Sequence, residues 1–276
     1  MTAAPVEQEV PAPTGVDALL AEKVVIAFGG LIAVNDVTFN VPEGGIVSLI
    51  GPNGAGKTTF FNVLTGLYRP TAGRVYLGGR DVTGRPPHKI ASLGLARTFQ
   101  NIRLFNLMTA EENVMVAMHA HLHSGIASTV FGLPWQRREE RRAHEASREL
   151  LEFVGIGKVR NEYARNLSYG DQRRLEVARA LALNPRVLLL DEPTAGMNPQ
   201  ESARFVDFVH RVRDEKGVSV LLIEHDMSVV MRVSERITVL DRGERIAEGG
   251  PDDIRTNERV VEAYLGKTGT REGRRK

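Results

Sequence analysis

The residues with the clearest chemical potential form the stretch GPNGAGKTT, Gly51–Thr59, which follows the apolar run Ile46–Ile50. Its order of glycine, four residues, glycine, lysine and threonine matches the loop that binds nucleotide phosphates. Glycines let backbone N–H groups converge on phosphate oxygens, and the helix that follows adds its positive end. We expect Lys57 to meet the β- and γ-phosphates, Thr58 to bind Mg²⁺ and Thr59 to reach the α-phosphate. The residues predicted to contact the nucleotide here are Gly51, Pro52, Asn53, Gly54, Ala55, Gly56, Lys57, Thr58 and Thr59.

Two carboxylates and a histidine end two further apolar runs. Asp191 and Glu192 follow Val187–Leu190, and His225 closely follows Val220–Ile223. A parallel sheet collects ligands at the carboxyl ends of its strands, so these side chains are expected near the phosphate loop. We expect Asp191 to hold Mg²⁺, directly or through water, and Glu192 to act as general base on the attacking water. His225 is expected to donate to the γ-phosphate.

Each of these assignments has a structural alternative. A glycine turn can arise by chance, an aspartate often caps a helix, and a lone histidine is more often structural than catalytic. The strand–loop–helix setting of the glycines and the positions of the acids favour the functional interpretation. Lys57, Glu192 and His225 are therefore the predicted catalytic residues. The group His119, His121 and His123 is not expected to bind metal, because its spacing does not place all three on one helical face.

The elements that must position these residues follow from the hydrophobic pattern. Residues 23–42 are β-like, a short strand is expected at 74–79, and a hairpin at 236–250. The continuous apolar runs are typical of strands covered on both faces, as in a parallel sheet. Residues from about 109 to 165 have helical spacing and heavy charge, and a further helix is expected at 171–184.

Composition limits the classes of protein to which the chain can belong, and the pattern along the chain predicts its domain boundaries. The chain has 276 residues, 42% of them hydrophobic, a net charge of +2 and no cysteine, which excludes disulfides and thiolate zinc sites. Its apolar runs are far shorter than the roughly 20 residues of a membrane-spanning helix. We expect a disordered leader at 1–19, one large domain at 20–266 that contains a helical subdomain at about 107–185, and a basic tail at 267–276.

The segment NLSYGDQRR, Asn166–Arg174, resembles the LSGGQ signature of the ATP-binding subunits of ATP-binding cassette (ABC) transporters. It lies between the phosphate loop and LLLDEP, as in that family, and the resemblance covers about Leu20 to Gly266. It implies an α/β fold with a P-loop NTPase core and a mainly parallel sheet. It also implies an N-terminal antiparallel β subdomain and an inserted α-helical subdomain.

The resemblance implies further site residues. Phe28 matches the aromatic residue that stacks on adenine, and Gln100 matches the glutamine that touches Mg²⁺ and water and senses the membrane partner. Ser168 and Gly170 match residues that contact the γ-phosphate held by the other subunit. Residues 195–199, AGMNP, match the loop that joins the two sites across the dimer. Implied cofactors are therefore ATP and Mg²⁺.

The chain departs from the family pattern at three positions. Tyr169 replaces the first glycine of the signature, Asp171 replaces its glutamine, and Asn198 stands where many relatives have aspartate. Ser168 and Gly170 are retained, and exposed N–H groups at the start of the signature helix form an anion site. Two chains arranged head to tail would place each anion site on the other's γ-phosphate.

Three longer segments narrow the resemblance to the ATPases of branched-chain amino acid importers. They are AFGGLIAVNDVTFNV, RTFQNIRLFNLMTAEENV with the long insert that follows it, and VVEAYLG. ATPases of urea importers and of lipopolysaccharide export share much of this pattern. A soluble ABC ATPase of translation or DNA repair is a further alternative, but such chains usually carry two cassettes or a long coiled coil. A non-hydrolysing regulatory subunit is disfavoured because Glu192 and His225 are both present.

The resemblance also implies partners and a place in the cell. These are membrane permease subunits, a second identical or related ATPase subunit and a periplasmic or extracellular solute-binding protein, with no nucleic acid. The chain would lie peripherally on the cytoplasmic face of the membrane. Arg103, Leu104 and Phe105 are either an ordinary loop or a docking surface for a permease helix, and the residues alone leave both open. The sequence does not identify the transported solute.

Overall fold

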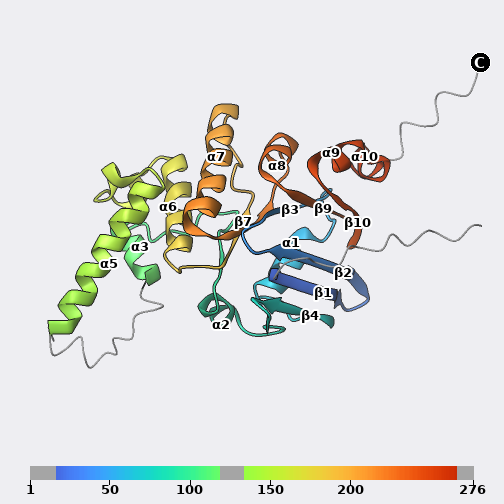
Figure 1. The fold of residues 1–276 in the computed structure, drawn as a ribbon, viewed down its shortest axis with the longest axis horizontal. Coiled ribbons are helices and arrows are strands. Elements are labelled where there is room, and N and C mark those ends of the chain that lie inside the picture. The colour runs from blue at the N-terminus through green and yellow to red at the C-terminus, as the bar shows by residue number, and fades with distance from the viewer. Residues whose placement is uncertain (1–16, 119–133, 266–276) are drawn as a thin grey trace, which may run out of the picture.

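The computed structural model describes residues 17–118 and 134–265, which form two sheets and the helices around them (Figure 1). The first sheet is antiparallel, with the strand order β2-β1-β4-β5. Its strands are β1 (Asp17–Phe28), β2 (Leu31–Pro42), β4 (Ala72–Leu77) and β5 (Arg80–Asp81). Because β1 begins at Asp17, the last three residues of the range predicted as a leader lie in this strand.

The second sheet has six strands in the order β10-β9-β3-β8-β7-β6. Its strands are β3 (Ile46–Ile50), β6 (Leu95–Arg97), β7 (Val187–Asp191), β8 (Ser219–Ile223), β9 (Arg236–Asp241) and β10 (Glu244–Gly249). All neighbours are parallel except the β9–β10 hairpin. Leu49 and Asp191 both lie opposite Ile223, so the ends of β3 and β7 are level at one edge of the sheet.

The central strands are buried on both faces, and their two faces belong to different hydrophobic cores. Leu189 and Leu221 pack into a core shared with the antiparallel sheet and with α1 (Lys57–Leu64), which lies between the two sheets (Figure 1). Leu188 and Leu222 pack into a second core on the opposite face. The alternation of neighbouring residues therefore places the phosphate-loop helix against one face of these strands and a separate group of helices against the opposite face.

The second core contains a group of helices at one end of the molecule (Figure 1). They are α3 (Ala110–Met118), α5 (Pro134–Phe153) and α6 (Tyr169–Leu181), with short 3₁₀ turns at Gly157–Val159 and Ala164–Asn166. These helices lie within the range predicted as a helical subdomain. The group His119, His121 and His123 lies outside the described residues.

Shorter and C-terminal helices complete the structure. They are α2 (Pro87–Ser92), α7 (Pro199–Lys216), α8 (Met227–Val233), α9 (Pro251–Thr256) and α10 (Glu258–Leu265). Among the helices of residues 17–118 and 134–265, none is long and apolar enough to span a membrane. The predicted mainly parallel sheet, antiparallel N-terminal sheet and separate helical group are all confirmed.

Candidate active site

The phosphate loop between β3 and α1 requires glycine at two positions because other backbone segments pack directly against it. A Cβ on Gly51 would lie 2.1 Å from the Leu240 carbonyl oxygen of β9. A Cβ on Gly56 would lie 2.5 Å from the Ala33 carbonyl oxygen of β2, and Gly56 has φ of 95°. Side chains at these positions would push the loop away from its supports, so the glycines maintain its shape.

Lys57 is the first residue of α1 and is only 6% exposed. Its Nζ donates to the carbonyl oxygens of Gly51 at 2.7 Å and Pro52 at 3.0 Å. Burial lowers the pKa of Lys57, while the nearby negative charge of Glu192 opposes that shift. The structure therefore brings the predicted phosphate-binding lysine and the predicted general base into one electrostatic environment. Thr58 is exposed in the same first turn of the helix.

Glu192 is held between two of the other predicted site residues. Its Oε1 lies 2.6 Å from His225 Nε2, and its Oε2 accepts from Gln100 Nε2 at 2.7 Å. Its backbone N–H donates to the Ile223 carbonyl oxygen at 2.9 Å, and its φ is 48°. A left-handed conformation is uncommon for a residue other than glycine and is often retained at functional sites. Here the side chain of Glu192 is half-buried, whereas the residues of β7 before it are all buried.

Asp191 makes a buried ion pair that the sequence did not predict. Its Oδ2 lies 2.7 Å from Arg97 Nη2, with the two side chains 7% and 10% exposed. Arg97 Nη1 also donates to Asn62 Oδ1 of α1 at 2.8 Å. Arg97 thus joins β6, β7 and the phosphate-loop helix. In the sequence, the only sign that Arg97 belongs to the site is its position three residues before the predicted Gln100.

Glu224 is a second residue that sequence reasoning missed. It is 3% exposed and its Oε1 accepts from Thr194 N at 2.8 Å and from Thr194 Oγ1 at 2.6 Å. Its Oε2 accepts from the backbone N–H of His225 at 3.0 Å. Glu224 therefore fixes the loop after Glu192 relative to His225, which maintains the contact between the predicted base and histidine.

The predicted Mg²⁺ ligands offer a hydroxyl from Thr58, a carboxylate from Asp191 and an amide from Gln100. An all-oxygen donor set suits this hard cation. Because Gln100 Nε2 donates to Glu192, the amide oxygen of Gln100 is the atom left to bind a cation. Because Oδ2 of Asp191 faces Arg97, the second oxygen of the carboxylate is the better ligand. The residues therefore fit a Mg²⁺ ion that keeps several of its waters.

The predicted adenine-stacking residue, Phe28, lies at the end of β1 and is 47% exposed. Its ring meets the ring of Tyr68 edge to face, with centroids 5.3 Å apart. Tyr68 therefore fixes the orientation of Phe28 and leaves half of its surface accessible to a planar ligand.

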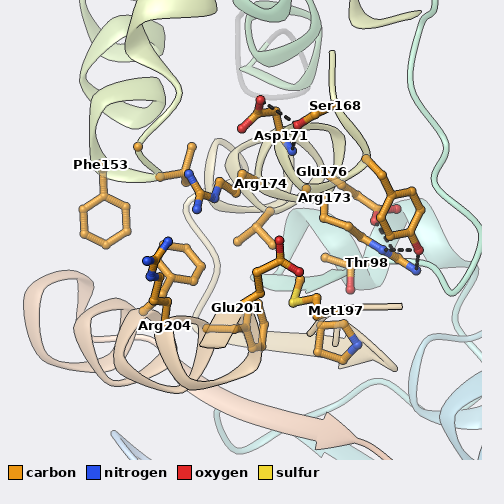
Figure 2. A pocket seen from close by; sticks show the side chains of 18 of the residues that line it. Thr98, Phe153, Ser168, Asp171, Arg173, Arg174, Glu176, Met197, Glu201 and Arg204 are labelled. Carbon is orange, nitrogen blue, oxygen red and sulfur yellow. Dashed lines mark hydrogen bonds and ion pairs between the residues drawn. The ribbon is translucent and has the colours of Figure 1, made fainter. Parts of the chain in front are cut away.

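Ser168 and Gly170 lie at the start of α6, within the helical group. Ser168 caps α6, with its Oγ accepting from Asp171 N at 3.2 Å and donating to Asp171 Oδ2 at 2.8 Å (Figure 2). The extra carboxylate of Asp171 thus serves the helix cap. Within the part of the chain that the structure describes, no hydrogen bond joins Ser168 or Gly170 to the phosphate loop. Both line a cavity of about 590 Å³ between α6 and α7.

Asn198, the third departure from the family pattern, caps α7. Its side chain accepts from the backbone N–H groups of Gln200 and Glu201, each at 3.0 Å. The Glu201 carboxylate in turn accepts from Asn198 N at 2.9 Å, which completes a capping box. An asparagine therefore performs the local structural role at this position as well as an aspartate would.

The fold and the site together define the class. A buried strand runs into a glycine loop with a lysine at its base, and the exit of a neighbouring parallel strand carries an ion-paired aspartate and a glutamate. This arrangement is that of a P-loop nucleoside triphosphatase.

The chain belongs to the ABC transporter family. The family profile described as ABC transporter matches residues 34–195, and a profile described as branched-chain amino acid ATP-binding cassette transporter matches residues 244–269. The high-affinity branched-chain amino acid transport ATP-binding protein BraF of Pseudomonas aeruginosa is 50% identical over 87% of this chain and 94% of its own length. These matches confirm the predicted family and the nucleotide-binding, ATP-hydrolysing nature of the domain.

Two solved structures extend the comparison to the fold. The ADP conformation of an ATP-binding cassette from an ABC transporter has a TM-score of 0.78 and 31% identity, over 91% of this chain and 99% of that chain. A dimeric cassette in a post-hydrolysis state, bound to ADP and Pi, has a TM-score of 0.70 and 26% identity, over 84% of this chain and 98% of that chain. The predicted fold class is confirmed.

Proposed function

We propose that this chain binds ATP with Mg²⁺ and hydrolyses it to power a branched-chain amino acid importer. The observation that carries the catalytic part is the position of Glu192, held by His225 and Gln100 and electrostatically coupled to Lys57. Mg²⁺, when bound, would neutralise charge on the phosphates. Side chains of the protein would bind the phosphates, accept the proton of the attacking water and position that water.

Lys57 would exchange its bonds to the loop carbonyls for phosphate oxygens, and its positive charge would stabilise the charge that develops on the γ-phosphate. Glu192 would take the proton of the attacking water, with its carboxylate oriented by two hydrogen bonds. His225, which lies against the Glu192 carboxylate, would donate to the γ-phosphate. Gln100 would place its amide oxygen toward the metal and the water.

We propose that two cassettes complete each other's sites. In one chain, Ser168 and Gly170 lie on the helical group and Lys57 lies between the two sheets, so these motifs form separate surfaces (Figure 1). The start of α6 offers N–H groups to an anion. A related cassette is dimeric with ADP and Pi, which supports a head-to-tail pair in which each α6 covers the partner's nucleotide. The second subunit is either another copy of this chain or a related ATPase.

The transported solute is proposed from relatives. BraF is a branched-chain amino acid transport protein, and the profile that matches residues 244–269 describes the same kind of transporter. Specificity would lie in the permease subunits and in a periplasmic or extracellular solute-binding protein. The ATPase would lie peripherally on the cytoplasmic face of the membrane, and no nucleic acid would be involved.

A docking surface for the permease is proposed on the segment after Gln100. Leu104 is partly buried against the second core, but Phe105 is 44% exposed and Leu107 74% exposed. Met108 and Tyr163 are also exposed. Exposed apolar side chains grouped in this way are typical of protein interaction sites.

The catalytic proposal is tested by Lys57→Ala. Loss of the cation should abolish ATP turnover, which is measured as phosphate release by the purified chain. Lys89→Ala is the matched control, because Lys89 is an exposed lysine on α2. Normal phosphate release by Lys57→Ala would refute the assignment of the phosphate loop.

The transport proposal is tested separately by pull-down from detergent-solubilised membranes. We expect the chain to be recovered with membrane permease subunits, and branched-chain amino acids to stimulate ATP hydrolysis by that complex when the solute-binding protein is added. Recovery only with ribosomes or DNA would instead favour a soluble ABC ATPase.

A further inference from the structure

Tyr169 stands where the family signature has glycine, and its side chain joins two separate parts of the site. Its hydroxyl accepts from Arg173 Nε at 3.2 Å and from Arg173 Nη2 at 3.0 Å, and it donates to the Ala195 carbonyl oxygen at 3.4 Å. A Cβ on Gly196 would lie 3.7 Å from Cε1 of the Tyr169 ring, so the ring also touches the loop after Glu192. A glycine could make none of these contacts.

Arg173 is 5% exposed and uses all of its donor groups. Its Nη1 donates to the Phe99 carbonyl oxygen at 2.8 Å and to Glu176 Oε2 at 3.3 Å. Its Nη2 donates to the Gln100 carbonyl oxygen at 2.6 Å as well as to Tyr169, and its Nε donates to Tyr169. The five N–H groups of a guanidinium are thereby matched by acceptors, of which Tyr169 receives two.

Glu176 also binds the segment of Phe99 and Gln100. Its Oε1 accepts from the Phe99 backbone N–H at 3.1 Å, while its Oε2 faces Arg173. Glu176 and Arg173 both lie on α6, and Figure 2 shows their two labelled side chains next to each other. The backbone of Phe99 and Gln100 is therefore attached to the signature helix by three hydrogen bonds.

This attachment continues to the predicted general base. The backbone of Gln100 is bonded to Arg173, and its side chain donates to Glu192 at 2.7 Å. The Ala195 carbonyl, which Tyr169 contacts, lies three residues after Glu192 in the chain. Tyr169 thus has one connection to Glu192 through Arg173 and Gln100, and a second through the loop that follows Glu192.

We propose that Tyr169 is a positioning residue for ATP hydrolysis. Its hydroxyl orients Arg173, and Arg173 holds Gln100 in place to orient Glu192. Because Tyr169 also lies beside Ser168, movement of α6 onto a nucleotide held by the partner subunit would be transmitted to the base of the same chain. The inference deepens the proposed function and rests on it.

The test compares Tyr169→Phe with Tyr76→Phe. Phenylalanine retains the ring but removes the acceptor that Nε and Nη2 of Arg173 share. The guanidinium then keeps its bonds to the Phe99 and Gln100 carbonyls and to Glu176 but is less well oriented. Tyr76 is the matched control because its hydroxyl also accepts from an arginine, Arg74 at 3.5 Å, but on the antiparallel sheet. Phosphate release gives kcat and KM, a fluorescent ATP analogue gives nucleotide affinity, and a thermal melt gives Tm.

We expect kcat of Tyr169→Phe to fall at least about tenfold, because two hydrogen bonds from the charged Arg173 to the hydroxyl are lost. KM and nucleotide affinity should stay within about twofold, because Lys57 and the phosphate loop are untouched. Because donors of the buried Arg173 lose their acceptor, the melting temperature of Tyr169→Phe should fall by about 2 to 4 °C for each kcal/mol of stability lost. Tyr76→Phe should behave as the wild type. A merely structural role would lower the melting temperature and leave kcat unchanged.

A double-mutant cycle with Arg173→Lys makes the outcome decisive if one variant is unstable. Lysine cannot bridge Tyr169 and the Gln100 carbonyl as a guanidinium does. The two substitutions should therefore be non-additive in kcat, and additive losses would overturn the proposal. Unchanged kcat in Tyr169→Phe would overturn it alone, whereas a wild-type chain that releases no phosphate would overturn the proposed function as well.

Discussion

Replacement of Glu192 by glutamine isolates the chemistry of the general base from the shape of the site. Glutamine has the same volume, and its amide oxygen can still accept from Gln100 Nε2, which lies 2.7 Å from the carboxylate. Its amide N–H can donate to His225 Nε2, which lies 2.6 Å from the other oxygen. The substitution therefore removes the negative charge and the basicity while both contacts are retained.

The expected loss of turnover rate in Glu192→Gln follows from the removal of the base while its contacts are retained. Positioned general acid–base groups contribute about 10²- to 10⁴-fold to the rate of a reaction. This factor corresponds to about 3 to 5 kcal/mol of activation free energy. Because Lys57, Thr58 and the phosphate loop are unchanged, the affinity for ATP should be retained. Glu192→Gln should consequently hold ATP without turning it over and accumulate as a dimer.

Two measurements check this expectation on the purified chain. Phosphate release gives the turnover number, and size-exclusion chromatography with and without ATP gives the oligomeric state. Glu215→Gln is the control, because Glu215 lies on the exposed surface of α7 in an ion pair with Arg211. A Glu192→Gln variant that turns over ATP within about threefold of the wild type would refute the role of the base. A variant that stays monomeric with ATP would count against shared sites.

Two further predictions concern stability. Arg97→Met should lower the free energy of unfolding by about 3 to 5 kcal/mol, because it leaves Asp191 buried without its partner. Urea unfolding measures this loss, and a value under about 1 kcal/mol would contradict the importance of the ion pair. Asp226 caps α8, and the hydrogen bond from Ser228 lowers the pKa of its carboxyl below 3.8. Its contribution is therefore present above that value and is lost as the pH falls through the lower pKa of the folded state. Asp226→Ala should cost about 1 kcal/mol at pH 7 and less as the pH approaches 3, and a pH-independent difference in urea unfolding would argue against this cap.

Local sequence patterns were sufficient for much of the fold. The phosphate loop and the apolar strands are contiguous in the chain, so their residue types report directly on their conformation. The start of β1 was placed too late because its alternation is broken. Its register shifts between Ala21 and Val24, and Lys23 has φ of 47°. A bulge of this kind interrupts the period of two by which a strand is recognised.

The contacts that orient the site residues could not be predicted from the sequence. Arg97 and Asp191 are 94 positions apart, and Arg173 and Gln100 are 73 apart. Such pairs depend on which strands are neighbours and on where α6 crosses the sheet edge. The roles predicted for the site residues stay predictions, but the structure brings His225 and Gln100 into contact with Glu192 and places Glu192 near enough to Lys57 to affect its pKa.

The strand β7 has an alignment problem that its apolar side chains cannot solve. Val187–Leu190 is apolar on both faces, so a shift of β7 by one residue relative to its neighbouring strands would bury an equally apolar surface. Such a shift would, however, exchange the faces of Asp191 and Glu192. Two contacts oppose this shift in register. They are the hydrogen bond from Glu192 N to the Ile223 carbonyl and the ion pair between Arg97 and Asp191. These contacts therefore also encode which of the two adjacent acids pairs with Arg97 and which meets His225 and Gln100, and the predicted roles of metal ligand and general base depend on that difference.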